Sequence, residues 1–340
     1  MFTINDLEKI DKFQMFKTYK KWPEIAYNSF NSDLKEINFN NINHIVFAGM
    51  GGSGAIGDFF SSILSKTEIH TSVVKGYLLP KTVDENSLVV VTSVSGNTVE
   101  TFEILKAAKK TDAKIITFSS NGIIENYSIK NQIDFRKIPQ IHSPRASFAG
   151  YLYSMLKVLR PIIPLTSNDI MESIEILRKM REDISSSNLG HTNKSLELAN
   201  WIKGIPLIYY PAGLQAAAIR FKNSLQENAK IHAIAEDVVE ACHNGIVSWE
   251  SNSTVQPILI EGKDDFYKTK ERWKILKDYF IENRIDFKKV NSVRGNILSK
   301  LIGLIYELDY ASYYKAIISN VDPSPVNSIE YIKKRTRVDL

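Results

Sequence analysis

The feature that most constrains this chain is a pair of short loops rich in glycine and hydroxyl residues. Residues 49–54 read GMGGSG and follow the β-forming run 44–48, while residues 93–98 read SVSGNT and follow the run 88–92. A helix-like pattern comes after each loop. Loops of this kind lie at the carboxyl ends of strands in open α/β sheets, where ligands bind. Glycines let the backbone approach an anion, and amides and hydroxyls donate to it. Neither loop carries a cation, so we expect a cradle for a small sugar phosphate rather than for a nucleoside triphosphate.

The order of the remaining elements predicts two successive α/β blocks. In the first block, strands are expected at 45–48, 71–75, 88–92, 114–118 and 133–138, and helices at 55–64, 98–110 and 147–159. In the second block, strands are expected at 205–210, 255–260 and 286–290, and helices at 214–225, 270–283 and 297–314. Short apolar runs that alternate with helices indicate parallel sheets covered on both faces. The predicted class is therefore α/β, with two αβα sandwich domains, each around a mainly parallel sheet.

Four segments follow from this pattern. Residues 1–40 are predicted to be a helical segment that packs on the first domain, and residues 41–160 are the first domain, with the phosphate-binding loops. Residues 161–195 are predicted to be a linker helix, and residues 196–340 a second domain with a C-terminal helix and tail.

Composition narrows the class of protein. The 340 residues carry a formal net charge of +5 without a dense basic block, so we expect neither a nucleic-acid nor a membrane partner. Cys242 is the single cysteine, which excludes a disulfide framework and a multi-cysteine metal site and fits a cytoplasmic location. The N-terminus lacks a signal-peptide pattern, and no apolar run approaches the roughly 18 residues of a membrane helix.

A dinucleotide-binding interpretation is an alternative for the first loop, because Gly49, Gly51 and Gly54 satisfy the Gly-x-Gly-x-x-Gly spacing. That fingerprint requires an acidic residue about 20 positions later, and residues 70–76 contain none. Two plainer interpretations stay open. The glycines could serve only a tight turn, and a hydroxyl of the second loop could serve only as a helix cap.

Several further segments carry a resemblance to a known family. They are residues 49–53, 93–101, 144–145 (PR), 226–230 (QENAK), 242–244 (CHN) and a tail from 308–312 to 322–325. On these segments the chain resembles the sugar isomerase (SIS) domain family, and more narrowly the archaeal bifunctional phosphoglucose/phosphomannose isomerases. They occur in the same order and span nearly the whole chain.

The resemblance implies a metal-independent isomerase without a cofactor, which interconverts fructose 6-phosphate with glucose 6-phosphate and mannose 6-phosphate through a cis-enediolate. Glu227 matches the base that moves a proton between C1 and C2, a role that suits a carboxylate. His243 matches the ring-opening histidine, and Arg145 the cation that stabilises the enediolate oxygen. The family further implies a homodimer in which the neighbouring subunit contributes His243.

The remaining site residues are implied for substrate binding. Those in the two loops are Gly51, Gly52, Ser53, Ser93, Ser95 and Thr98, with the hydroxyls on the 6-phosphate. Ser324 and Lys333 fall in the tail that closes the site, and Ser324 is the candidate for leaving room for a water near C1–C2. Proline-rich packing of the tail is the alternative.

Other functions also fit the fold. A sugar-phosphate sensor would need the hydroxyl loops but none of Glu227, His243 and Arg145, which would then be a solvated glutamate, a structural histidine and a surface arginine. An isomerase for another sugar phosphate is the third hypothesis. Its glucosamine 6-phosphate version normally has a glutamine-hydrolysing domain, and this chain lacks an N-terminal cysteine nucleophile.

Overall fold

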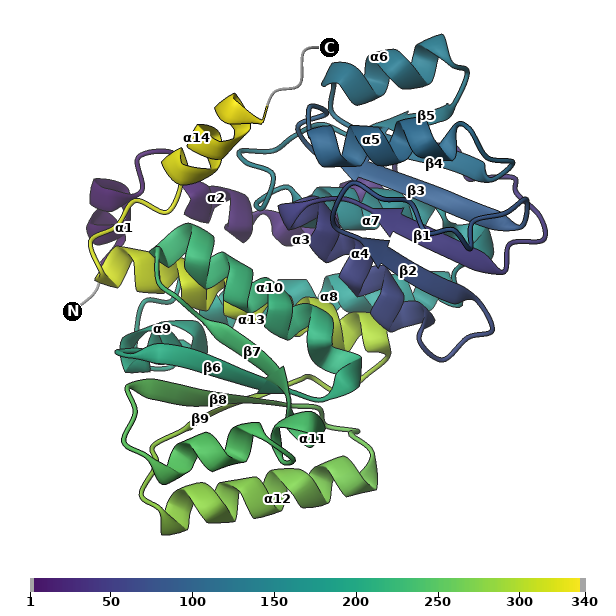
Figure 1. Ribbon diagram of the computed structural model, residues 1–340. Helices are drawn as coiled ribbons and strands as arrows, with labels where there is room; N and C mark the ends of the chain where they lie inside the picture. Colours follow the sequence, from purple (N-terminus) through teal and green to yellow (C-terminus); the bar gives the residue numbers. More distant parts are fainter. Residues whose placement is uncertain (1–2, 337–340) are drawn as a thin grey trace. The chain divides into compact units, whose positions relative to one another are not determined.

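The computed structural model describes residues 3–336 and divides them into two compact units. The β1–β5 unit comprises residues 21–167 and 325–336, and the β6–β9 unit comprises residues 3–20 and 168–324. Each unit has its own sheet and its own core, so each is described by itself (Figure 1).

The β1–β5 unit is built on a five-stranded sheet with the order β2-β1-β3-β4-β5, and all neighbouring strands are parallel. The strands are β1 (His44–Ala48), β2 (His70–Val74), β3 (Ser87–Ser93), β4 (Lys114–Ser119) and β5 (Asp134–Lys137). The helices are α3 (Trp22–Phe30), α4 (Gly51–Leu64), α5 (Val99–Ala108), α6 (Gly122–Lys130), α7 (Phe148–Val158) and α14 (Asn327–Arg335), with a 3-10 turn at Arg160–Ile162. Because β1 and β3 are parallel neighbours, the loops after them open at the same edge.

Alternate residues of the central strands serve opposite faces of this sheet. Val46 and Val89 pack into a cluster with residues of α5 and α6, such as Leu105. Phe47 points the other way and stacks on Phe60 of α4, with ring centroids 5.1 Å apart. Burial on both faces explains why β1 and β3 are continuous apolar runs rather than alternating ones.

The β6–β9 unit has a four-stranded parallel sheet with the order β7-β6-β8-β9. The strands are β6 (Ile205–Tyr210), β7 (Ile234–Asp237), β8 (Val255–Glu261) and β9 (Lys288–Asn291). The helices are α1 (Ile4–Ile10), α2 (Met15–Lys20), α8 (Ser167–Ile184), α9 (Lys194–Trp201), α10 (Gln215–Ser224), α11 (Val238–Ala241), α12 (Tyr267–Glu282) and α13 (Ile297–Ile318). Short helical turns occupy Ala212–Leu214, Leu225–Ala229 and Gly245–Glu250. One face of the sheet packs on α12, and α10 and α13 lie toward the other (Figure 1).

The predicted α/β class with two parallel sheets is confirmed, but the segment boundaries differ. Residues 1–40 do not act as one segment on the first domain, because residues 3–20 pack on α13 of the β6–β9 unit. There the rings of Tyr19 and Tyr310 lie 5.7 Å apart, and the Tyr313 hydroxyl donates to Asp11 over 3.1 Å. The tyrosines of α13 are therefore buried by residues of the N-terminal segment that contains α1 and α2.

Two other predicted boundaries also differ. The expected linker helix is α8, which belongs to the β6–β9 unit, whereas the C-terminal helix α14 groups with the β1–β5 unit. The predicted loop 51–54 forms the first turn of α4. The short strand β7 was not expected, because Ile234 and Ala235 are its only apolar residues.

No helix within the described part of the chain is long and apolar enough to cross a membrane. Among residues 3–336 no three His, Cys, Asp or Glu side chains gather closely enough to hold a metal ion.

Candidate active site

The first glycine-rich turn lies where β1 passes into α4. Gly51 has a φ of +52° and begins the helix, and Ser53 is buried in its first turn. The Ser53 hydroxyl accepts a hydrogen bond from the backbone N–H of Val94 over 3.2 Å. Ser53 therefore ties the first turn to the second loop, and this contact places both loops side by side at the carboxyl edge of the sheet.

The second loop is held in one shape by its own hydroxyls and by a glycine. The Ser93 hydroxyl is buried, donates to Thr98 Oγ1 over 3.0 Å and accepts from the Gly96 N–H over 3.1 Å. Gly96 has a φ of +70°, and a β-carbon there would lie 1.5 Å from the carbonyl oxygen of Asn121. The Ser95 side chain is half-buried and accepts only a long 3.4 Å bond from the Asn97 N–H. Of the loop hydroxyls, Ser95 and Thr98 are thus more available to a ligand than Ser93 and Ser53.

Arg145 lies in the turn before α7 and is 95% buried, with a 5% exposed fraction. A β-carbon on Gly52 would lie 3.2 Å from the Pro144 carbonyl oxygen and 3.3 Å from the Arg145 Cα, so the absence of a side chain at Gly52 lets the two turns touch. Ala146, which follows Arg145, is also held in place, because its carbonyl accepts a hydrogen bond from the Trp22 indole N–H over 3.0 Å. The structure thus brings Arg145 together with the two loops in the β1–β5 unit.

Glu227 lies in the other unit, on a π-helical turn (Leu225–Ala229) that ends α10. Turns of this kind are rare and occur frequently at functional sites. The turn ends at Lys230, whose backbone is left-handed with a φ of +57° and whose ammonium group donates to the carbonyls of Glu227 and Pro323. The Glu227 side chain is half-buried. Its carboxylate is therefore presented from a fixed turn rather than from a mobile helix end.

A buried polar network anchors this turn to α13. Arg220 and Asp309 form an ion pair with an Nη2–Oδ2 distance of 2.6 Å, and the Ser224 hydroxyl donates to the other Asp309 oxygen over 2.8 Å. One turn later, the Asn228 amide donates to the Ser312 hydroxyl over 2.9 Å. None of these residues was predicted from the sequence. The signal was present, since a charged residue at 309 interrupts an apolar helix and requires a buried partner.

His243 is exposed in the turn after α11. Its backbone N–H donates to the Glu240 carbonyl over 2.8 Å, and Asn244 caps the following 3-10 turn by accepting from the Gly245 N–H. Asn244 also donates to the Glu240 carboxylate over 2.8 Å. The turn is therefore fixed by its neighbours, while the imidazole is left at the surface.

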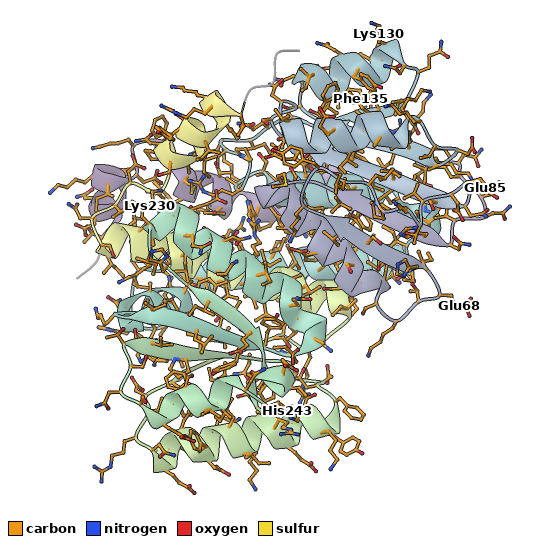
Figure 2. The ribbon with its side chains drawn as sticks, viewed as in Figure 1. Glu68, Glu85, Lys130, Phe135, Lys230 and His243 are labelled. Atoms are coloured by element: carbon orange, nitrogen blue, oxygen red, sulfur yellow. The ribbon has the colours of Figure 1, made fainter. Side chains whose placement is uncertain are left out.

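Glu227 and His243 lie at opposite edges of the same sheet. The helix α10 follows β6 and runs back, so its last turn lies at the amino edge, whereas His243 follows β7 and α11 at the carboxyl edge. Figure 2 shows this separation through Lys230, at the end of the Glu227 turn, and His243 beside α12. The structure does not bring these two residues of one chain together.

The tail residues fall in different units. Ser324 ends the β6–β9 unit, where its N–H donates to Asp322 over 2.9 Å, and its neighbour Pro323 is bonded to Lys230. This links Ser324 to the Glu227 turn. Lys333 is exposed on α14, a helix of the β1–β5 unit.

Comparison with known proteins gives the family. A model described as "SIS domain" matches residues 38–153, and one described as "Bacterial phospho-glucose isomerase C-terminal SIS domain" matches residues 191–336. The chain is thus a protein of two SIS domains. It belongs to the SIS-domain family, within the branch of bifunctional phosphoglucose/phosphomannose isomerases, as the following relatives show.

Several relatives carry the name "Bifunctional phosphoglucose/phosphomannose isomerase", among them proteins from Caldicellulosiruptor bescii and Thermoplasma acidophilum. The protein from Caldicellulosiruptor bescii is 31% identical over 301 residues, covering 85% of this chain and 88% of the relative. The protein from Thermoplasma acidophilum is 32% identical over 298 residues, with the same coverage. A third relative is a protein from Sulfolobus acidocaldarius named "D-glucosamine-6-phosphate 4-epimerase". It is 26% identical over 293 residues, and the match covers 85% of this chain and 88% of the relative.

Solved structures agree on the fold. The C-terminal domain of glucosamine-fructose-6-phosphate aminotransferase from Francisella tularensis superposes with a TM-score of 0.67 at 20% identity, covering 91% of this chain and 96% of that one. A glucose-6-phosphate isomerase like protein from Thermus thermophilus gives a TM-score of 0.64 at 14% identity, covering 99% and 100%.

Proposed function

We propose that this protein is an isomerase that interconverts fructose 6-phosphate with glucose 6-phosphate and mannose 6-phosphate. The observation that carries the proposal is the 31–32% identity, over 85% of the chain, to two relatives named for both activities. The hydroxyl-lined loops support it, because they offer donors to a phosphate ester without a cation of their own.

The proposed chemistry assigns one role to each polar group. His243 moves a proton between the ring oxygen and the neighbouring hydroxyl, which opens the sugar. Glu227 then removes the proton from C2 of the aldose, exchanges it with solvent while the enediolate is bound, and protonates C1, as a hydroxyl proton moves from O2 to O1. Arg145 stabilises the negative oxygen of the cis-enediolate between these steps. The fixed π-helical turn supports the base role, since a carboxylate that serves two neighbouring carbons must keep its position.

The two loops are proposed to hold the 6-phosphate. Ser95 and Thr98 are the donors that we assign to the phosphate oxygens, with the N-terminal amides of α4 and α5. Ser53 and Ser93 shape the loops, because each is already used in bonds between or within them. Ser324 and Lys333 remain part of the proposal as residues of the tail that closes over the sugar.

We further propose a cytoplasmic homodimer in which each site receives His243 from the partner subunit. Two observations support it. The separation of Glu227 and His243 across one sheet argues against their acting together within a chain. Exposed apolar side chains also flank the histidine turn, where Ile234, Val239 and Val247 are 47%, 40% and 57% exposed. A second copy that covers this surface would bury them.

The epimerase relative favours one second candidate. An enzyme acting at C4 of an amino sugar phosphate would share the fold and the phosphate cradle. The test is product identity in the presence of EDTA, starting from fructose 6-phosphate in one reaction and glucosamine 6-phosphate in another. Glucose and mannose 6-phosphates support the isomerase, glucose 6-phosphate alone removes the second activity, and conversion of only the amino sugar favours the epimerase. Binding without turnover of either would promote the sensor.

A further inference from the structure

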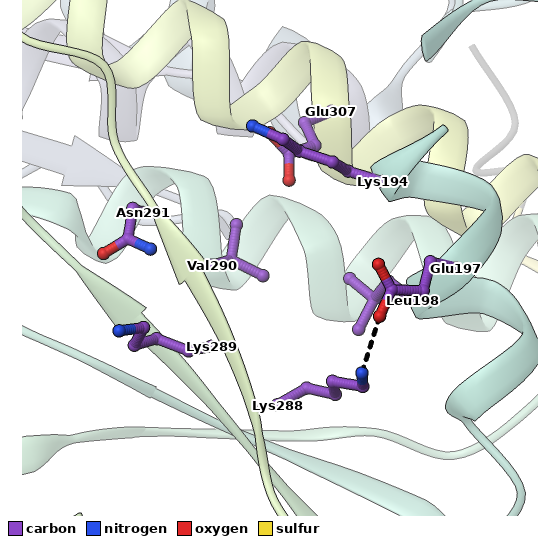
Figure 3. Close-up of a pocket in the computed structure, with 8 residues that line it drawn as sticks. All are labelled: Lys194, Glu197, Leu198, Lys288, Lys289, Val290, Asn291 and Glu307. Atoms are coloured by element: carbon purple, nitrogen blue, oxygen red, sulfur yellow. Dashed lines mark hydrogen bonds and ion pairs between the residues drawn. The ribbon is translucent and has the colours of Figure 1, made fainter. Parts of the chain in front are cut away.

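A polar cavity of about 390 Å³ lies between α9, β9 and α13 in the β6–β9 unit, and the buried Glu307 side chain reaches into it (Figure 3). Two lysines of β9 line this cavity, but they face opposite sides of the sheet. Lys288 pairs with Glu197 of α9 over 2.7 Å, whereas Lys289 aligns with Leu259, which packs toward α12. The charges of the cavity therefore do not converge on one ligand, and the cavity does not define a binding site.

In the β1–β5 unit, the turn that carries Arg145 is closed on itself by Ser147. This serine is 1% exposed, and its hydroxyl oxygen accepts from the Ile141 N–H over 2.8 Å. The hydroxyl also donates to the carbonyl of Ser143 or Ile141, over 2.9 or 3.0 Å. The Ser147 N–H donates to the Ser143 carbonyl over 2.9 Å. Residues 141–147 therefore form a compact loop whose internal bonds set its shape, while its place in the unit depends on other contacts.

Two contacts from elsewhere in the unit hold this loop. On one side it touches Gly52, where a β-carbon would lie 3.3 Å from the Arg145 Cα. On another side Trp22, with 0% exposure, donates its indole N–H to the Ala146 carbonyl over 3.0 Å. The indole is itself fixed, because it stacks on Phe148 of α7 with ring centroids 6.1 Å apart and 28° between the planes. The Gly52 contact limits how closely the loop approaches, whereas the indole bond sets the orientation of a peptide group next to Arg145.

We propose that Trp22 is a positioning residue for Arg145. Its indole N–H fixes the carbonyl of the residue after Arg145, and rotation of that peptide would displace the whole arginine side chain. The inference rests on the proposed function, in which Arg145 stabilises the enediolate. Because that charge develops only as the enediolate forms, a displaced guanidinium lowers kcat and leaves binding of the sugar phosphate unchanged. Trp22 has no exposed surface, so it acts through Arg145 rather than on the sugar.

The test is a double-mutant cycle of Trp22→Phe with Arg145→Met, measured as kcat and KM for fructose 6-phosphate. Phenylalanine keeps an aromatic ring beside Phe148 and removes the indole donor. We expect Trp22→Phe to lower kcat about tenfold and to leave KM within about twofold of the wild type. In the Arg145→Met background the same change should lower kcat less than about twofold, because the guanidinium that it displaces is absent. Equal losses in the two backgrounds, or a higher KM with an unchanged kcat, would overturn the proposal.

Trp201→Phe is the matched control, because its indole N–H also forms a hydrogen bond, to Asp286 over 2.6 Å, in the other unit. It should leave kcat unchanged, and a loss equal to that of Trp22→Phe would contradict a specific role of Trp22. Thermal melts establish that each variant is folded. Ser147→Ala, which loosens the same loop from inside, enters the same cycle if Trp22→Phe does not fold.

Amide hydrogen exchange of residues 141–147 in the unliganded protein tests the positioning without turnover. We expect Trp22→Phe to speed this exchange several-fold, and Trp201→Phe to leave it unchanged. A wild-type protein without turnover would refute the proposed function, whereas unchanged exchange in the folded Trp22→Phe variant would refute the role of Trp22.

Discussion

Arg220 and Asp309 form an ion pair in the core of the β6–β9 unit, with 3% and 0% of their side chains exposed. The Arg220 Nε and Nη2 atoms both reach Asp309 Oδ2, over 3.1 and 2.6 Å. The pair joins α10 to α13 one turn before the π-helical turn that carries Glu227. A bond between two helices thus also sets the position of the proposed base.

Asp309→Asn should lower the free energy of unfolding by roughly 3–5 kcal/mol, because Arg220 would remain buried without a counter-charge. Urea denaturation measures this loss. Ser224→Ala is the matched control, since it removes only one hydrogen bond of the same carboxylate and should cost about 1 kcal/mol. A loss for Asp309→Asn no larger than that of the control would show that the pair does not support the fold.

Gly96→Ala should destabilise the protein by about 1–3 kcal/mol and raise KM for the sugar phosphate, because its φ of +70° is unfavourable for alanine and the β-carbon would overlap the Asn121 carbonyl. Gly213→Ala is the control, because open space surrounds that position. Its stability should change by no more than about 1 kcal/mol. Thermal unfolding and steady-state kinetics compare the two, and equal behaviour would mean that the second loop does not depend on this glycine.

The sequence predicted the two sheets, their parallel strands and the position of the second hydroxyl loop, because long apolar runs and glycine spacing report local structure directly. It did not predict that residues 3–20 cover α13, since packing of Tyr19 on Tyr310 joins segments almost 300 positions apart. The π-helical turn at Glu227 also left no periodic signal, as it depends on Lys230 adopting a left-handed backbone.

The arrangement of the site residues also depends partly on local structure and partly on the fold of each unit. Contacts within the β1–β5 unit join Arg145 to the first glycine-rich turn at Gly52, although the sequence indicated Arg145 only through the family resemblance. The opposite positions of Glu227 and His243 follow from the direction of α10 and from β7, a four-residue strand with only two apolar residues, too few to be recognised in the sequence. The roles of these residues stay predictions until they are measured.

Mixed dimers test the origin of the histidine. Glu227→Gln and His243→Ala subunits are each expected to be nearly inactive alone. When they are combined, one site of each hybrid would have both an intact Glu227 and an intact His243, so we expect about a quarter of the wild-type turnover in a statistical mixture. Affinity tags on each subunit verify the hybrids. Verified hybrids without recovered activity would assign both residues to the same chain.

Glu307 should give the stability a distinct pH dependence. Its pKa is raised to about 7 by burial in the folded state, so the folded protein binds a proton that the unfolded chain releases near pH 4.5. Stability is then lost as pH rises through this window and is constant above it. The difference between Glu307→Gln and the wild type should therefore grow in favour of the variant by roughly 2–3 kcal/mol between pH 5 and pH 8. Urea titrations at both pH values measure it, and a difference independent of pH would contradict the buried acid.

Transfer of a solvent deuteron is the most direct test of the central claim. Fructose 6-phosphate is incubated with the protein in D₂O, and the aldose products are analysed for deuterium at C2. A base that works through an enediolate exchanges its proton with solvent, so we predict deuterium at C2 of both glucose 6-phosphate and mannose 6-phosphate, formed orders of magnitude more slowly by Glu227→Gln. Products formed without deuterium, or at an undiminished rate by the folded variant, would contradict Glu227 as the base.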